Sequence, residues 1–347
     1  MERIPVVIIL VICSFVSLAL SSGRLTHSAI AQDLENQSGQ PVVSADSMSY
    51  KLKTLGGKQF WTDQINYGGW RIQINAISEH YRLLDPTNRR HHSGTKDECL
   101  AALDQLKEDG KAKQCTGQVV IVLHGLIRTT HSMRKLGRYL QDNSEITAVD
   151  FEYASTRKPV AYHAQALADV IDSLGDEVNK IHFVAHSMGN IVVRHYLADL
   201  KRAGKSEERF GRMVMIGPPN QGSKMARVMR WSFLFNVVAG AAGYELGKGW
   251  DELEPNLATP DFEFGIIAGG QSDDSVFSNF ILVGKDDFTV SVEEASLPGA
   301  TDFLIKPLTH ATMMRKPLTL EATLRFLNHG YFIAADQKNP IIQSSEP

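Results

Sequence analysis

Ser187 stands where a strand-like segment meets a helix-like segment. Residues 181–185 are mostly β-branched or aromatic, and residues 191–197 place apolar side chains at helical spacing. On such a strand–turn–helix junction a serine hydroxyl projects beyond the sheet edge, towards the free N–H groups of the helix. The small residues Ala185 and Gly189 leave room for a tight turn. We therefore predict that Ser187 is a nucleophile; the alternative is a serine that only caps the helix.

A serine nucleophile needs a histidine to take its proton and a carboxylate to hold that histidine. His310 follows a strand-like segment at 302–305 and is the predicted base. Asp287 is the predicted acid, because the D-x-x-V spacing anchors its loop through Val290, and Asp286 is the alternative. Three further carboxylates lie in the same region: Asp273, Asp274 and Asp302.

The reaction also needs hydrogen-bond donors for the oxyanion of the tetrahedral intermediate. The backbone N–H of Met188, directly after the serine, is one predicted donor. The N–H of Leu126 is the other, because His124-Gly125 ends the apolar run 119–123 and glycine lets the backbone approach a substrate closely. The alternative is that His124-Gly125 merely ends a strand.

Alternating strands and helices must position these residues. Such an order predicts an α/β fold with a mostly parallel central sheet and helices on both faces. Ligands of these sheets bind at the carboxyl ends of the strands, which is where Ser187 lies. The expected strands are 119–123, 146–153, 181–185, 213–216, 264–268 and 302–305, and the expected helices are 132–140, 161–174 and 318–327.

Two segments interrupt or precede this alternation. Residues 58–116 carry strand-like runs, a polar loop at 88–96 and a helical pattern at 98–108. The insert 224–257 is apolar, and we expect it to form a lid or acyl-binding wall; an ordinary pair of core helices is the alternative. Its predicted substrate-binding residues are Trp231, Phe233 and Phe235.

The two ends of the chain are expected to lie outside the catalytic domain, which spans 58–334. Residues 1–31 read as a signal peptide cut after Ala31, which predicts export to the periplasm or secretion; an uncleaved N-terminal anchor is the alternative. Residues 32–57 read as a disordered lead-in and 335–347 as a polar tail.

Composition limits the partners. The chain has 347 residues, of which 43% are hydrophobic, and a formal net charge of −3. No strongly basic segment suggests nucleic acid as a partner, and no regular Cys/His spacing predicts a metal site. Outside the predicted signal peptide the cysteines are Cys99 and Cys115, which could pair in an exported protein or remain free thiols.

Taken as an ordered set, these motifs resemble the lipase and carboxylesterase branch of the α/β-hydrolases, over about residues 117–329. The segment Ala185-His186-Ser187-Met188-Gly189 is similar to that of small bacterial triacylglycerol lipases. The other matching segments are Leu123-His124-Gly125-Leu126, Gly217-Pro218-Pro219-Asn220-Gln221-Gly222-Ser223, Asp287 and His310.

The resemblance implies hydrolysis of carboxylic esters, often lipid esters at a lipid interface, through an acyl-enzyme and without a cofactor. The acidic loop departs from the family pattern, with D-F-T-V in place of D-G-x-V, and residues 58–116 suggest extra strands at the sheet edge. An acyltransferase, a thioesterase or a peptidase could use the same three residues, and a non-catalytic exported lipid-binding module is the alternative from another class.

Overall fold

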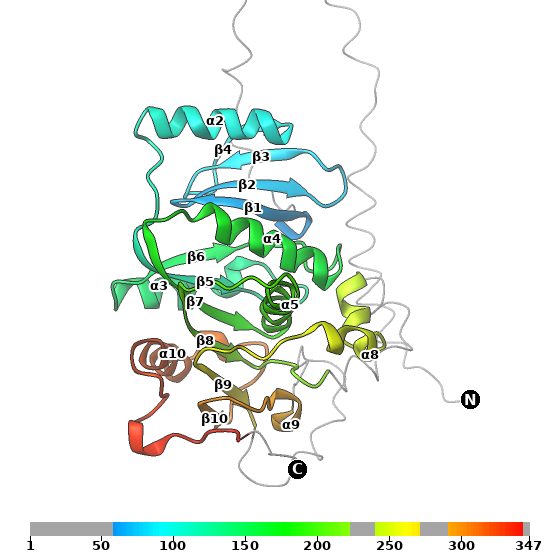
Figure 1. Ribbon diagram of the computed structural model, residues 1–347, viewed down its shortest axis with the longest axis vertical. Helices are drawn as coiled ribbons and strands as arrows, with labels where there is room; N and C mark the ends of the chain where they lie inside the picture. Colours follow the sequence, from blue (N-terminus) through cyan, green and yellow to red (C-terminus); the bar gives the residue numbers. More distant parts are fainter. Residues whose placement is uncertain (1–57, 223–239, 271–290, 343–347) are drawn as a thin grey trace, which may run out of the picture. The chain divides into compact units, whose positions relative to one another are not determined.

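The computed structural model describes residues 58–222, 240–270 and 291–342 (Figure 1). The predicted signal peptide and lead-in, residues 1–57, lie outside these ranges. No helix within them has the length and apolar character needed to cross a bilayer.

Six parallel strands form the main sheet, in the spatial order β10-β9-β8-β7-β5-β6. All six were expected from the apolar runs, because a strand buried on both faces is apolar along its length. The strands are β5 (Gly117–Leu123), β6 (Thr147–Phe151), β7 (Val178–His186), β8 (Phe210–Ile216), β9 (Phe264–Gly269) and β10 (Asp302–Lys306).

Helices cover both faces of this sheet, as predicted (Figure 1). Alternate residues of the strands point to opposite faces. Ile121 and Phe183 belong to the core beneath α4 (Val160–Ser173) and α5 (Met188–Arg202). Val120 and Val184 belong to the core beneath α3 and α10. The bounds of these two helices are Arg134–Asp142 for α3 and Pro317–His329 for α10.

Short helical segments connect these elements. They are η3 (Thr130–Ser132), α8 (Trp250–Leu253), η4 (Glu254–Asn256), α9 (Val292–Ala295), η5 (Met313–Arg315) and η6 (Ala335–Gln337). Two of them follow directly on loops that carry predicted site residues: η3 follows the loop of Leu126, and η5 follows the loop of His310.

The N-terminal segment makes an antiparallel sheet of its own, with strand order β1-β2-β3-β4. The extra strands expected at the sheet edge therefore pair with one another instead of extending the main sheet. Their bounds are β1 (Trp61–Tyr67), β2 (Trp70–Asn75), β3 (Tyr81–Leu84) and β4 (Arg90–Gly94), with η2 (Lys58–Phe60) before them and α2 (Lys96–Glu108) after them.

The prediction of a polar loop at 88–96 is wrong, because β4 lies within it. This strand is polar because it is the exposed edge of the small sheet, where backbone pairing with β3 holds it without apolar side chains. Helix α2 starts two residues earlier than expected, at a capping box formed by Thr95 and Glu98.

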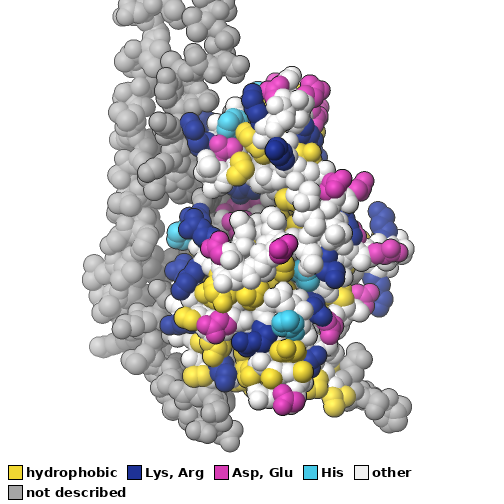
Figure 2. All heavy atoms as spheres, turned by 90° about the vertical axis from the view of Figure 1, so that its left-hand side faces the viewer, with side chains coloured by type: hydrophobic (Ala, Val, Ile, Leu, Met, Phe, Trp, Pro, Cys, Tyr) yellow, Lys and Arg dark blue, Asp and Glu magenta, His cyan; other side chains and the backbone are white. Residues whose placement is uncertain are grey.

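Cys99 and Cys115 are both buried free thiols. Burial raises the pKa of the Cys99 thiol to about 11, so it is protonated and unreactive at neutral pH. On the face shown in Figure 2, side chains of both charge signs are interspersed, and hydrophobic side chains surface mainly in the lower half.

Candidate active site

Ser187 lies in the sharp turn between β7 and α5, with φ of +52°. A non-glycine residue in this left-handed region is strained, and such strain persists only where the surroundings hold it. Here the Ser187 N–H donates to the carbonyl of Ile216 at the end of the neighbouring strand β8 (2.9 Å). The serine is thereby fixed at the carboxyl edge of the sheet, at the N-terminus of a long helix.

A second strained turn lies beside it. Residues Gly125 to Arg128 form a four-residue turn in which the Arg128 N–H donates to the Gly125 carbonyl (3.2 Å). Its third residue, Ile127, has φ of +60°, at a position where glycine is usual. The Ile127 N–H donates to Ser155 Oγ (3.1 Å). Leu126, the predicted oxyanion donor, is the second residue of this turn, which we call the oxyanion turn.

The oxyanion turn touches the serine turn at Gly125. A Cβ placed on Gly125 would lie 3.1 Å from the Cβ of Ser187 and 3.0 Å from His186 Nδ1, tighter than ordinary van der Waals contact. Glycine therefore lets the two turns approach this closely without displacing either one. The backbone just before Leu126 therefore lies beside Ser187.

His310 reaches the same edge from the loop after β10. Its ring packs against Gly217, the residue after Ile216, because a Cβ on Gly217 would lie 2.8 Å from His310 Nδ1. Burial, with a smaller contribution from the cation of Arg128, lowers the pKa of His310 to about 4. The imidazole is therefore neutral at pH 7, which is the state that a general base requires.

His186 links the serine strand to the histidine loop. Its Nε2–H donates to the backbone carbonyl of His310 (3.0 Å), and the two rings lie 4.8 Å apart. Burial and the neighbouring His310 hold the pKa of His186 well below its usual range, so the ring stays neutral. No role was expected for His186 from the sequence, although it directly precedes Ser187.

Several predicted site residues lie outside the described ranges: Asp287, its alternative Asp286, and the apolar residues Trp231, Phe233 and Phe235. Asp302, a further carboxylate in the region of the predicted acid, lies within the described ranges. Its carboxylate accepts the N–H groups of Phe332 (2.7 Å) and Asn339 (3.0 Å), which makes it a structural residue.

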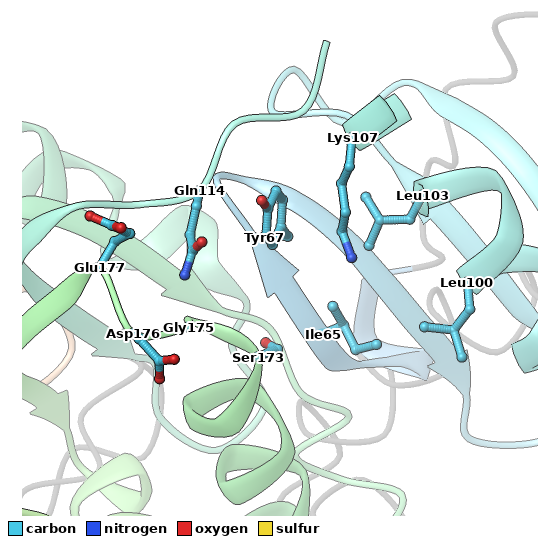
Figure 3. A pocket seen from close by; sticks show the side chains of 10 residues that line it. All are labelled: Ile65, Tyr67, Leu100, Leu103, Lys107, Gln114, Ser173, Gly175, Asp176 and Glu177. Atoms are coloured by element: carbon cyan, nitrogen blue, oxygen red, sulfur yellow. The ribbon is translucent and has the colours of Figure 1, made fainter. Parts of the chain in front are cut away.

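The hollow drawn in Figure 3, of about 460 Å³, is not at this edge. It lies between the small sheet and residues 175–177, which directly precede β7 and so belong to the amino edge of the main sheet. A second hollow of about 510 Å³ lies beside α3 and η5, lined by the cations of Arg134, Lys135 and Arg138. Within the described ranges, no three His, Cys, Asp or Glu side chains gather as metal ligands would.

A parallel sheet with a strained serine turn after a central strand is the arrangement of the α/β-hydrolases. The chain has the α/β-hydrolase fold. A family model described as a domain of unknown function, DUF7379, matches residues 87–250, which include Leu126 and Ser187. No curated protein matches the sequence.

Solved structures of α/β-hydrolase lipases and lipolytic enzymes are similar to the chain. The mature lipase BlEst2 of Bacillus licheniformis is 18% identical, with a TM-score of 0.46, over 60% of this chain and 91% of that one. A structure reported for the metagenome-derived lipolytic enzymes LipS and LipT is 14% identical, with a TM-score of 0.44, over 62% and 95%. Lipase B of Aspergillus fumigatus is 13% identical, with a TM-score of 0.45, over 62% and 53%. The strand order and the serine turn are the features that define the fold of this chain.

Proposed function

We propose that the chain is a serine hydrolase that cleaves carboxylic esters, lipid-like ones in particular, through an acyl-enzyme on Ser187. One observation carries the proposal: the strained serine turn touches the oxyanion turn at Gly125. The two turns carry the Ser187 hydroxyl and the proposed oxyanion donors, which are the backbone N–H groups of Leu126 and Met188. Acyl transfer needs a nucleophile and oxyanion donors in this arrangement.

In the proposed mechanism the Ser187 hydroxyl attacks the ester carbonyl while its proton passes to His310. The N–H groups of Leu126 and Met188 bind the oxyanion of the tetrahedral intermediate. His310 then gives its proton to the departing alcohol as the bond between the carbonyl carbon and the alcohol oxygen breaks. Water attacks the resulting serine ester, with His310 again as base, and releases the acid and the free serine. Asp287 is the proposed partner of His310.

The decisive test is covalent labelling of the full chain with a fluorophosphonate, combined with hydrolysis of p-nitrophenyl esters. Ser187→Ala should abolish labelling and lower kcat by at least about 1000-fold. Ser173→Ala, on α4 and remote from the serine turn, should retain both. A Ser187→Ala chain that labels and hydrolyses like wild type would overturn the proposal, and a folded wild type that does neither would favour a lipid-binding module.

Esters of graded acyl length, offered in solution and as an emulsion, test the lipid-like substrate. If Trp231, Phe233 and Phe235 form the acyl wall, Trp231→Ala should raise KM for long acyl chains more than for acetate. Product analysis with water and with added alcohols separates a hydrolase from an acyltransferase. Export after cleavage at Ala31 is also proposed, and an exported product that begins at Gln32 is the expected result of N-terminal sequencing.

A further inference from the structure

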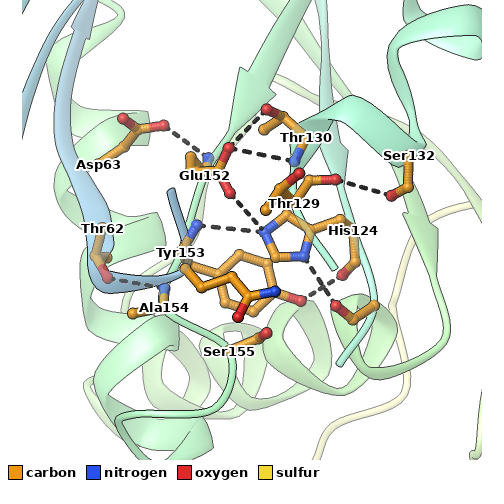
Figure 4. A network of polar contacts seen from close by, with 12 residues as sticks. Thr62, Asp63, His124, Thr129, Thr130, Ser132, Glu152, Tyr153, Ala154 and Ser155 are labelled. Carbon is orange, nitrogen blue, oxygen red and sulfur yellow. Dashed lines mark hydrogen bonds and ion pairs between the residues drawn. The ribbon is translucent and has the colours of Figure 1, made fainter. Parts of the chain in front are cut away.

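A buried chain of polar groups runs from the small sheet to the oxyanion turn (Figure 4). It starts at Asp63 on β1, passes through Glu152 just after β6 and ends at His124, directly before the turn. Asp63 and His124 are 0% exposed and Glu152 is 2% exposed. Burying ionisable groups is costly unless each is paired, so these contacts decide what the cluster does.

The first link joins the small sheet to the end of β6. The Asp63 N–H donates to the Glu152 carbonyl (2.9 Å), and the Glu152 N–H donates back to Asp63 Oδ2 (2.7 Å). Next to this pair, the Ala154 N–H donates to Thr62 Oγ1 (3.1 Å). Main-chain and side-chain atoms of β1 therefore fix the backbone on which Glu152 stands.

The second link joins Glu152 to both flanks of the oxyanion turn. Its Oε2 accepts hydrogen bonds from the Thr130 hydroxyl (2.7 Å) and the Thr130 N–H (3.3 Å), after the turn. Its Oε1 lies 3.4 Å from His124 Nε2, before the turn. One carboxylate thus hydrogen-bonds the chain after residues 125–128 and contacts the chain before them.

The third link reaches the turn itself. The His124 Nδ1–H donates to the carbonyl of Gly125 (2.9 Å), the same carbonyl that closes the turn by accepting the Arg128 N–H. The Tyr153 hydroxyl donates to the His124 carbonyl, and the two rings stack with centroids 4.2 Å apart. The Gly125 carbonyl and the Leu126 N–H belong to the same peptide group. The orientation of His124 therefore fixes the direction of the Leu126 N–H.

The small sheet supplies the groups that keep Asp63 in place. Gln73 Nε2 donates to Asp63 Oδ1 (2.7 Å), and Arg82 donates to Gln73 Oε1 through Nε (2.9 Å) and a second nitrogen (2.7 Å). Arg71 lies 3.7 Å from the same Asp63 oxygen. The direction of Asp63 is thus set from the side remote from the oxyanion turn.

We propose that Asp63 and Glu152 are positioning residues for the oxyanion turn, through which the small sheet holds the Leu126 N–H in place. The inference rests on the proposed function, because it concerns the same site. It assigns a catalytic purpose to residues 58–116, the segment that the resemblance to lipases left without one.

The test compares Asp63→Asn and Glu152→Gln with wild type in the full chain, using p-nitrophenyl butyrate and titration of reactive serines with a fluorophosphonate. Removing an oxyanion donor costs about 100- to 1000-fold in kcat, and a loosened donor should cost less, about 10-fold per titrated site. KM should change by less than about 2-fold, since the donor acts on the transition state. The Ki of a trifluoromethyl ketone, which forms an oxyanion, should rise as kcat/KM falls.

Asp302→Asn is the matched control. Asp302 is also buried, and its carboxylate accepts two backbone N–H groups where that of Asp63 accepts one, but these groups belong to Phe332 and Asn339 after α10. It should lose stability like Asp63→Asn and retain kcat per titrated site. If Asp63→Asn does not fold, Thr130→Val decides, because it removes only the hydroxyl that donates to Glu152.

The inference alone is overturned if the wild type is active and both Asp63→Asn and Glu152→Gln retain its kcat per titrated site and its Ki for the ketone. A wild type that neither labels nor hydrolyses esters overturns the proposed function and this inference with it. The double variant Asp63→Asn/Glu152→Gln should lose less than the product of the two single losses, because the residues act through one chain of contacts. If the losses in kcat of the two single variants multiply fully in the double variant, the two residues do not act through one chain of contacts.

Discussion

Gly217→Ala should disable the site while leaving the fold intact. Gly217 has φ of +53°, is buried, and directly follows Ile216, whose carbonyl accepts the Ser187 N–H. A methyl group there would lie 2.8 Å from His310 Nδ1, 3.0 Å from His310 Cε1 and 3.0 Å from Met313 Sδ. The backbone around Gly217 is tied to two strands, so the imidazole is the part that must move.

The size of the effect follows from these distances. Ordinary contact begins near 3.5 Å, so the ring must retreat by about 0.7 Å. A displacement of about 1 Å in a catalytic group can cost about 100-fold in rate, which makes a loss of about 30-fold or more in kcat the expectation. The left-handed backbone adds a stability loss of about 1–2 kcal/mol, because alanine is strained at this φ.

Gly204→Ala separates the two effects. Gly204 has φ of +63° and no atom within 4 Å of the added Cβ, so it carries the same backbone strain without the collision. Both variants should unfold at similar urea concentrations, and Gly217→Ala alone should lose ester hydrolysis and fluorophosphonate labelling. If Gly217→Ala retains more than half of the wild-type kcat, His310 is not the base or the ring is not held where the structure places it.

Three further predictions concern titration and the triad acid. Burial lowers the pKa of His310 to about 4, so kcat/KM in short assays should hold as the pH falls from 7 to 5 and decline near 4; a decline near pH 6.5 would show that a carboxylate partner such as Asp287 offsets the burial. Burial lowers the pKa of His182 to about 4 from an ordinary 6.5, so the unfolded chain takes up the proton first and stability is lost as the pH falls below 6.5. Between pH 7.5 and pH 4.5, the free energy of unfolding measured in urea should therefore fall by about 2–3 kcal/mol less in His182→Gln than in the wild type. Asp287→Asn should lower kcat by about 1000-fold or more and Asp286→Asn by less than about 10-fold, and the reverse order would make Asp286 the acid.

The main sheet could be predicted from the sequence because its strands are buried on both faces. In β5, residues 119–123 are at most 1% exposed, and their continuous apolar character is the direct result of that burial. The serine turn could be predicted for a similar reason, since a strand pattern and a helix pattern meet there within a few residues. These signals are local in the sequence, so they can be recognised without knowledge of the tertiary contacts.

Strand β4 of the small sheet, and the link from that sheet to the oxyanion turn, had no such signal. Strand β4 is polar and exposed, so pairing with β3 alone makes it a strand. Asp63 and Glu152 are 89 residues apart, and no periodicity reveals that a carboxylate on one segment accepts the N–H of another. The one available clue was Glu152 itself, a charged residue at the end of an apolar strand, where only a buried partner makes it tolerable.

The strained backbone at the site needs support, and the small sheet supplies part of it. Among the described residues, four non-glycine residues have positive φ, and two of these, Ser187 and Ile127, lie in the facing turns of the site. Each left-handed residue costs about 1–3 kcal/mol and is retained only if neighbouring structure holds it. Strand β8 holds Ser187 through Ile216, whereas the oxyanion turn lies beyond the last pairing of β5 and pairs with none of the described strands. The buried chain of polar contacts from Asp63 supplies that support. Apolar side chains could fill the same space, but they could not fix the direction of a peptide group, whereas hydrogen bonds can.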